Sequence, residues 1–195
     1  KAVEGAGPLP YDIANVNVGY VADDPGVPTG FWRSVAFSTN VFVVESAIDE
    51  IAAAGGHDPV TLRERFLTTS PRLLHVVRLA AERAGWGKAV PGVARGIAAM
   101  DFQGTQVAAV AELRDDGSTW QVNRLVFAVD CGRVINPALV TAQIEGGAAF
   151  GLTAALKSHI TVSGRSVVQS NFHDFPLLRF NEMPAVDVHL VDSDA

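Results

Sequence analysis

The stretch FAVDCGRVINPALVTAQIEGGAAFGLTAAL, residues 127–156, decides the fold because a strand leads through a tight turn directly into a helix. Its apolar start predicts a buried strand, which ends where Asp130 begins the turn. Asn136 followed by Pro137 marks the start of the helix, since Asn caps free amides and Pro loses no hydrogen bond at the first helical position. The helix is predicted to occupy 137–156.

This predicted helix has three glycines in its interior, Gly146, Gly147 and Gly151. Each glycine costs about 1 kcal/mol relative to alanine, so the helix carries a penalty of about 3 kcal/mol. Such a penalty indicates that something lies against the helix backbone. Two explanations are open: the helix packs closely on a sheet or another helix, or a large ligand lies against its face of small residues.

The rest of the chain predicts a helical part followed by a strand-rich part. Apolar residues at helical spacing predict a helix at about 39–54, and the cap-then-proline pairs Asp58-Pro59 and Ser70-Pro71 predict the starts of two more, which gives three helices within about 39–85. Alternating apolar residues and turn signals predict strands at 16–21, 93–102, 105–113, 120–129, 158–162, 167–170 and 186–191.

The predicted fold class is α+β, with mixed or antiparallel sheets and the helix at 137–156 packed on a sheet. Residues 1–92 are expected to form a loop, a short strand and the three-helix segment. Residues 93–195 are expected to form a sheet-rich segment that includes the glycine-bearing helix. Both segments are interpreted as parts of one larger polypeptide.

Composition narrows the classes of partner. The 195 residues carry a net charge of −6 with scattered Lys and Arg, which argues against a nucleic-acid partner. No apolar run approaches the roughly 18 residues of a membrane-spanning helix, so no span is expected. Cys131 is the only cysteine, and the five histidines lack zinc-ligand spacing, so no side-chain metal site is predicted.

Two polar side chains are candidates for ligand contact. Arg33 lies between Trp32 and Ser34 in an apolar stretch after a Pro/Gly loop. A buried guanidinium there needs an acceptor, which leaves open a structural ion pair or contact with an anion or substrate. Gln143 can present both a donor and an acceptor to a ligand on the helix. The residues alone predict no complete reaction centre.

Three segments in order resemble one family: FWRSVAFSTNVFVVESAIDEIA (31–52), VFAVDCGRVINPALVTAQIEGGAAFGLTAAL (126–156) and VVQSNFHDFPLLRFNEMPAVDVHLVDSD (167–194). They are similar to the large, molybdopterin-binding subunit of molybdenum hydroxylases, the xanthine dehydrogenase and aldehyde oxidase superfamily. The isoquinoline 1-oxidoreductase beta-subunit type, with its aldehyde-oxidising relatives, is the branch that the segments resemble most. The resemblance extends from about Gly5 to Asp194.

The resemblance implies a molybdenum–molybdopterin cofactor, in bacteria typically the cytosine dinucleotide form. It implies hydroxylation of N-heteroaromatic rings or oxidation of aldehydes, with water as the oxygen source. Expected partners are the remainder of the large subunit, a small [2Fe-2S] subunit that accepts the electrons, and a small aromatic or aldehyde substrate. A periplasmic location is common in the family.

The same resemblance implies roles for particular residues. Trp32 and Arg33 match the family's active-site arginine loop and are expected near the substrate. Four residues match the Q-x-E-G-G helix and are expected near the cofactor: Gln143, Glu145, Gly146 and Gly147.

The catalytic glutamate of the family lies in a G-V-G-E-P-like segment, which is expected beyond Ala195, and most pterin-binding loops lie upstream. The chain alone is therefore expected to be inactive. The alternative hypothesis is a non-catalytic scaffold or assembly domain that keeps the fold without the metal.

Overall fold

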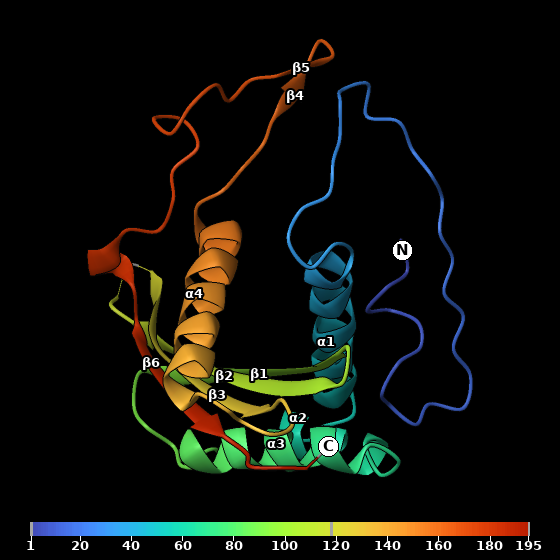
Figure 1. Cartoon of the computed structure of the whole chain (residues 1–195), viewed down its shortest axis with the longest axis vertical. Coiled ribbons are helices and arrows are strands. Elements are labelled where there is room, and N and C mark those ends of the chain that lie inside the picture. The colour runs from blue at the N-terminus through green and yellow to red at the C-terminus, as the bar shows by residue number, and fades with distance from the viewer. Residues whose placement is uncertain (1, 118, 195) are drawn as a thin grey trace.

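The computed structural model describes residues 2–117 and 119–194, and their elements form an α+β fold (Figure 1). The helices are α1 (Phe37–Ala54), α2 (Pro59–Phe66), α3 (Pro71–Arg83) and α4 (Pro137–Leu156), with a short 3₁₀-helix, η1 (Phe180–Glu182). The strands are β1 (Val93–Phe102), β2 (Thr105–Asp115), β3 (Trp120–Asp130), β4 (Val162–Ser163), β5 (Ser166–Val167) and β6 (Ala185–Leu190). The predicted fold class is confirmed. The division at residue 92 stays a prediction.

The main sheet has the strand order β1-β2-β3-β6 and is mixed. Strands β1, β2 and β3 form an antiparallel meander, whereas β6 lies parallel to β3. A parallel pair needs a long connection, and here α4 and an extended arm, residues 157–179, lie between the two strands. The α4 helix contacts β6, which leaves most of α4 away from the sheet.

The core lies between α3 and one face of this sheet. Ala108 and Val110 of β2 pair with Ala128 and Val126 of β3, and all four side chains are buried. Small residues at these positions allow the helix backbone to approach the sheet closely. Their partners on α3 are also buried: Leu73, Val76, Val77, Ala80 and Ala81.

A buried polar cluster joins α1 to α2, β1 and the N-terminal segment. The guanidinium of Arg63 donates to the carboxylate of Glu45 at 3.0 Å, and the hydroxyl of Tyr11 donates to the same carboxylate at 2.6 Å. The backbone N–H of Ala99 also donates to the Glu45 carboxylate, at 2.8 Å. Burial raises the pKa of Glu45, although Arg63 opposes the shift. Because these groups bind one another, we interpret the cluster as structural.

A second ion pair anchors the C-terminal end of β3. Arg72 donates to the carboxylate of Asp130 at 2.7 and 2.8 Å, and the hydroxyl of Ser193 donates to it at 2.6 Å. The backbone N–H of Gly132 donates to the same group at 3.1 Å. These donors, Arg72 first, hold the pKa of Asp130 well below its usual range. The pair therefore ties α3 and the chain near Ser193 to the turn that precedes α4.

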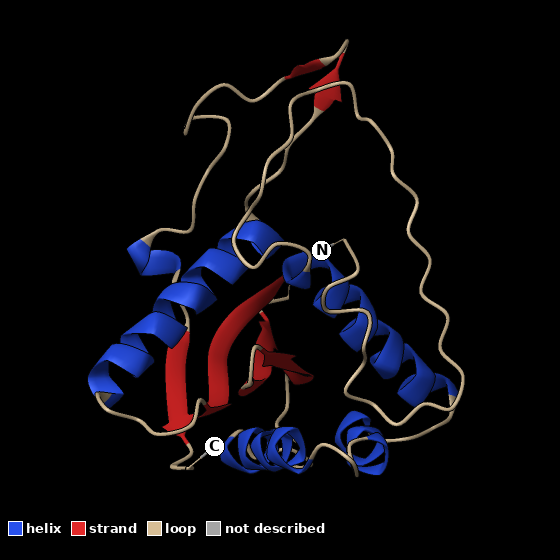
Figure 2. Cartoon of the chain, turned by 45° about the vertical axis from the view of Figure 1, so that its right-hand side comes forward, coloured by secondary structure: helices blue, strands red, loops and turns tan. Residues whose placement is uncertain are grey.

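The α1 and α4 helices lie on the side of the sheet opposite to α3 (Figures 1 and 2). Two largely exposed segments extend beyond them, residues 14–36 before α1 and residues 157–179 after α4. The strand predicted at 16–21 is wrong, because this segment pairs with no described strand. The strands predicted at 158–162 and 167–170 shorten to the small hairpin β4–β5, which has no third strand to support it.

Candidate functional site

The α4 helix is positioned by the turn that follows β3. The amide oxygen of Asn136 accepts a hydrogen bond from the backbone N–H of Leu139 at 3.2 Å, and Pro137 occupies the first helical position, as predicted. Gly132 has a φ of 76°, a left-handed conformation that glycine adopts without strain. The turn therefore sets where α4 starts and the direction in which it leaves the sheet.

The glycines of α4 face open space within the described part of the chain. A methyl group added at Gly146, Gly147 or Gly151 would meet no atom within 4 Å, apart from the nearby backbone of the helix itself. Only Ala148 of this helix is buried. Among the described residues, close packing therefore does not account for these three glycines, although α4 does contact β6. The ligand explanation stays a prediction.

The four residues predicted to lie near the cofactor fall on two different sides of α4. Gln143 and Gly147 are four positions apart and share one face, and Gly146 borders that face. These three residues and Gly151 define the glycine face of α4. Glu145 is two positions from Gln143, and at 100° per residue it lies on another side of the helix. The structure thus brings Gln143 together with the glycines and separates Glu145 from them.

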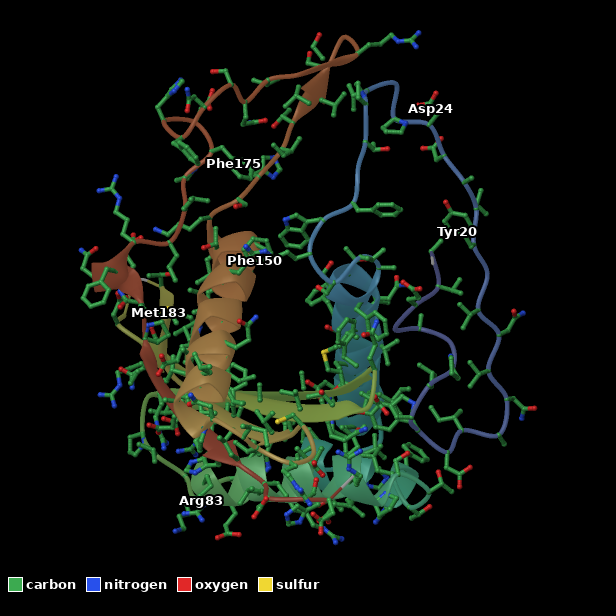
Figure 3. The ribbon with its side chains drawn as sticks, viewed as in Figure 1. Tyr20, Asp24, Arg83, Phe150, Phe175 and Met183 are labelled. Atoms are coloured by element: carbon green, nitrogen blue, oxygen red, sulfur yellow. The ribbon has the colours of Figure 1, made fainter. Side chains whose placement is uncertain are left out.

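The predicted arginine loop contacts the far end of α4, where Figure 3 labels Phe150. The ring centroids of Trp32 and Phe150 are 4.9 Å apart, and the guanidinium carbon of Arg33 lies 4.5 Å from the centroid of the Phe150 ring. Such aromatic and cation–π contacts each stabilise by about 0.5–1.5 kcal/mol. The buried structural ion pair considered for Arg33 is not found among the described residues, because the side chain is exposed and stacks on an aromatic ring.

The loop that carries Arg33 has an unusual backbone. Ser34 and Val35 both have left-handed conformations, with φ values of 59° and 51°. A β-branched residue is rarely found there, and each such residue costs about 1–3 kcal/mol. Hydrogen bonds hold the turn: the N–H of Val35 donates to the carbonyl of Trp32 at 3.0 Å, and the N–H of Phe37 to that of Ser34 at 3.0 Å.

Phe150 was not among the residues predicted for the site. The signal available was its position seven residues after Gln143, which places it on the same face of the predicted helix. Its contact with Trp32 joins residues that are far apart in the sequence, so only the tertiary structure reveals it.

Two further properties bear on the site. Among residues 2–117 and 119–194, no group of three or more His, Cys, Asp or Glu side chains could hold a metal ion. The α4 helix is the one described helix that is long and apolar enough to cross a membrane, with 20 residues and a mean hydropathy of 1.2. Length and composition alone support that possibility, and core helices of soluble proteins have the same properties.

Comparison with known families decides the classification. The family described as the molybdopterin cofactor-binding domain matches residues 38–184, which include nearly all of α1, the whole of α2 to α4 and all three strands of the meander. The chain belongs to this molybdopterin cofactor-binding family. The match confirms the resemblance found in the sequence, and it includes the glycine face.

Three curated relatives agree with the classification. The chain is 36% identical over 194 residues to the beta subunit of isoquinoline 1-oxidoreductase from Brevundimonas diminuta, covering 96% of this chain and 25% of the relative. It is 31% identical over 204 residues to the B subunit of nicotinate dehydrogenase from Pseudomonas putida, covering 93% and 17%. It is 28% identical over 208 residues to the membrane-bound aldehyde dehydrogenase [pyrroloquinoline-quinone] of Gluconacetobacter polyoxogenes, covering 94% and 27%. The chain thus spans about a quarter or less of each relative.

Proposed function

We propose that this chain forms one wall of the molybdopterin site in the large subunit of a molybdenum hydroxylase. The observation that carries the proposal is the glycine face of α4, on which added methyl groups would meet open space. A helix with about 3 kcal/mol of glycine penalty and no packing partner for those glycines is suited to a flat ligand at its backbone. Membership of the cofactor-binding family supports the same assignment.

The residues of the glycine face fit such a cofactor. Gly146 and Gly147 leave the helix backbone accessible, and the exposed amide of Gln143 offers one acceptor and two donor hydrogens to polar groups of a pterin. The chain would hold the organic part of the group, since its described residues include no cluster of metal-ligating side chains. When bound, the molybdenum centre supplies a two-electron oxidation in which water provides the oxygen. The cytosine dinucleotide form is the form we propose.

The substrate end of the site is proposed at Trp32 and Arg33. The indole ring offers an apolar surface to a planar substrate, and the guanidinium N–H groups can bind a substrate oxygen. We propose N-heteroaromatic compounds or aldehydes as substrates and a [2Fe-2S] subunit as electron acceptor. The names of the relatives, which include isoquinoline, nicotinate and aldehyde, support these substrate classes.

The remainder of the subunit is proposed to complete the site and to cover the exposed apolar side chains of α4. Leu139 and Leu156 are 68% and 57% exposed, which fits burial against further protein. The charged side chain of Glu145 in the middle of α4 disfavours this helix as a membrane span. Because the chain spans 17–27% of its relatives, we propose that it turns over no substrate alone.

The competing function is a scaffold or assembly domain that lacks the metal. Metal and pterin analysis of the full-length subunit, purified with its partner subunit, separates the two functions. The enzyme requires molybdenum near one atom per subunit, released pterin, and iron in the partner. A full-length complex that contains neither molybdenum nor iron would favour the scaffold and contradict the proposal.

A further inference from the structure

Phe150 of α4 contacts both members of the arginine loop. Its ring lies 4.9 Å from the ring of Trp32 and 4.5 Å from the guanidinium carbon of Arg33. The side chain is partly buried, as are Ala149 and Leu152 beside it on α4. The ring therefore links the end of α4 to the loop before α1, two elements that no strand pairing connects.

Contact with the Phe150 ring leaves the hydrogen-bonding capacity of Arg33 unused. A cation–π contact employs the charge of the guanidinium, whereas the N–H groups point outward in its plane. In the part of the chain that the structure describes, no carboxylate or carbonyl accepts a hydrogen bond from this side chain. The donors are thus available to an oxygen of a ligand.

The turn after Arg33 limits where these donors can lie. Ser34 and Val35 are left-handed, and the hydroxyl of Ser34 donates to the carbonyl of Arg33 at 2.6 Å. Strained backbone of this kind persists where surrounding contacts fix it, and it occurs frequently at ligand-binding sites. The side chains of Trp32 and Arg33, which come just before this turn, both pack against the Phe150 ring.

Helical spacing connects this contact to the glycine face. Phe150 follows Gly147 by three positions and Gly146 by four, so all three lie on one side of α4. Three residues of α-helix span about 4.5 Å, which places the guanidinium roughly one helical turn from the glycines. A ligand on the glycine face could therefore present an oxygen to Arg33.

We propose that Phe150 is a positioning residue, which holds Arg33 so that its N–H groups bind an oxygen of a ligand on the glycine face. The ligand chemistry is a carboxylate, carbonyl or phosphate oxygen attached to a planar group. That oxygen comes from the substrate or from the cofactor. The inference rests on the proposed function, because it assigns a task to Phe150 within the same site.

The test uses the full-length subunit with its partner and four variants: Phe150→Leu, Phe150→Tyr, Arg33→Met and Phe180→Leu. Two quantities are measured for each, molybdenum per subunit and the Kd of benzoate, a planar carboxylate used as the probe. Phe150→Tyr keeps a ring, and Arg33→Met tests the donor directly if Phe150→Leu folds poorly. Phe180→Leu is the matched control, because Phe180 is 98% exposed and lies outside the site.

Phe150→Leu and Arg33→Met should each weaken benzoate binding about tenfold, the effect of losing one charge-assisted contact. If the molybdenum content stays at the native value, the oxygen belongs to the substrate. If molybdenum falls together in both variants instead, the oxygen belongs to the cofactor. Phe150→Tyr and Phe180→Leu should keep both native values.

The proposal is overturned if Phe150→Leu keeps both native values, or if the native protein shows neither molybdenum nor benzoate binding. A native protein that binds benzoate but holds no molybdenum refutes the proposed function alone. In that case, weaker benzoate binding by Phe150→Leu still supports the positioning role.

Discussion

Replacing two of the three α4 glycines by alanine, Gly146→Ala with Gly147→Ala, should stabilise α4 in this chain. The added methyl groups would meet no described atom within 4 Å beyond the nearby helix backbone, so no clash opposes the change. Each glycine in a helix interior costs about 1 kcal/mol relative to alanine, which gives an expected gain of about 2 kcal/mol. This gain should raise the stability of α4 against local unfolding more than that of the whole chain, because only one residue of α4 is buried and the helix is weakly coupled to the core.

Hydrogen exchange of the α4 backbone amides measures this gain, since a poorly packed helix opens locally before the whole chain unfolds. A gain of about 2 kcal/mol should slow exchange by about 30-fold if opening precedes exchange in rapid equilibrium. Helicity followed by circular dichroism should rise in parallel, and the core amides of α3 should change little.

A matched control distinguishes two effects of a glycine-to-alanine substitution, the space available to the added methyl group and the backbone conformation of the glycine. Gly56 also has no atom within 4 Å of an added methyl group, but its φ is 65°. Gly56→Ala should therefore destabilise the chain by about 1–2 kcal/mol, the cost of a left-handed alanine. Faster exchange in the α4 double variant would refute the reasoning, because it would show that something in this chain already presses on the glycine backbone.

Three further substitutions test the remaining contacts. Arg63→Met should lower the free energy of unfolding by about 3–5 kcal/mol at neutral pH, because the Glu45 carboxylate stays buried without its partner. Chemical denaturation should show part of this loss recovered in acid as Glu45 is protonated, and an unchanged stability would contradict the buried pair. Asp130 has a lowered pKa in the folded state, so it stabilises fully above the unfolded pKa of about 3.9 and less as the pH falls below it. Asp130→Asn should reduce that acid dependence and lower the free energy of unfolding by about 2–3 kcal/mol at pH 7, a value discounted because Arg72 is partly exposed. If the variant and the native chain lose stability identically as the pH falls, Asp130 does not cause the acid dependence. Arg33→Ala should change the free energy of unfolding by less than about 1 kcal/mol, since an exposed cation–π contact contributes little. A fall in melting temperature of several degrees would instead mark Arg33 as a structural residue.

Local sequence patterns predicted most of the secondary structure because the relevant signals act over a few residues. Asp58 caps α2 by accepting from the N–H groups of Val60 and Thr61, and Asn136 caps α4, both as predicted. Ser70 is an exception: its hydroxyl donates to the carbonyl of Pro10 and does not cap α3. A cap signature thus predicts where a helix starts, but the side chain of the cap residue can form its hydrogen bond with a distant residue instead of with the helix.

Features that depend on distant contacts could not be predicted. The parallel pairing of β3 with β6 follows from the path of α4 and the arm, which no local pattern specifies. The glycines of α4 were explained equally well by packing or by a ligand until the structure showed open space around them. Phe150 was missed for the same reason, since its partners Trp32 and Arg33 belong to a loop before α1.

The proposed position of molybdopterin against the glycine face of α4 is tested by the variant Gly147→Leu in the full-length subunit. The control is Gly19→Leu, at a glycine that also has open space and lies in the exposed segment before α1. We expect Gly147→Leu to lose most of its molybdenum and pterin while the subunit stays folded, and Gly19→Leu to keep both. Native molybdenum and pterin content in Gly147→Leu would contradict the claim.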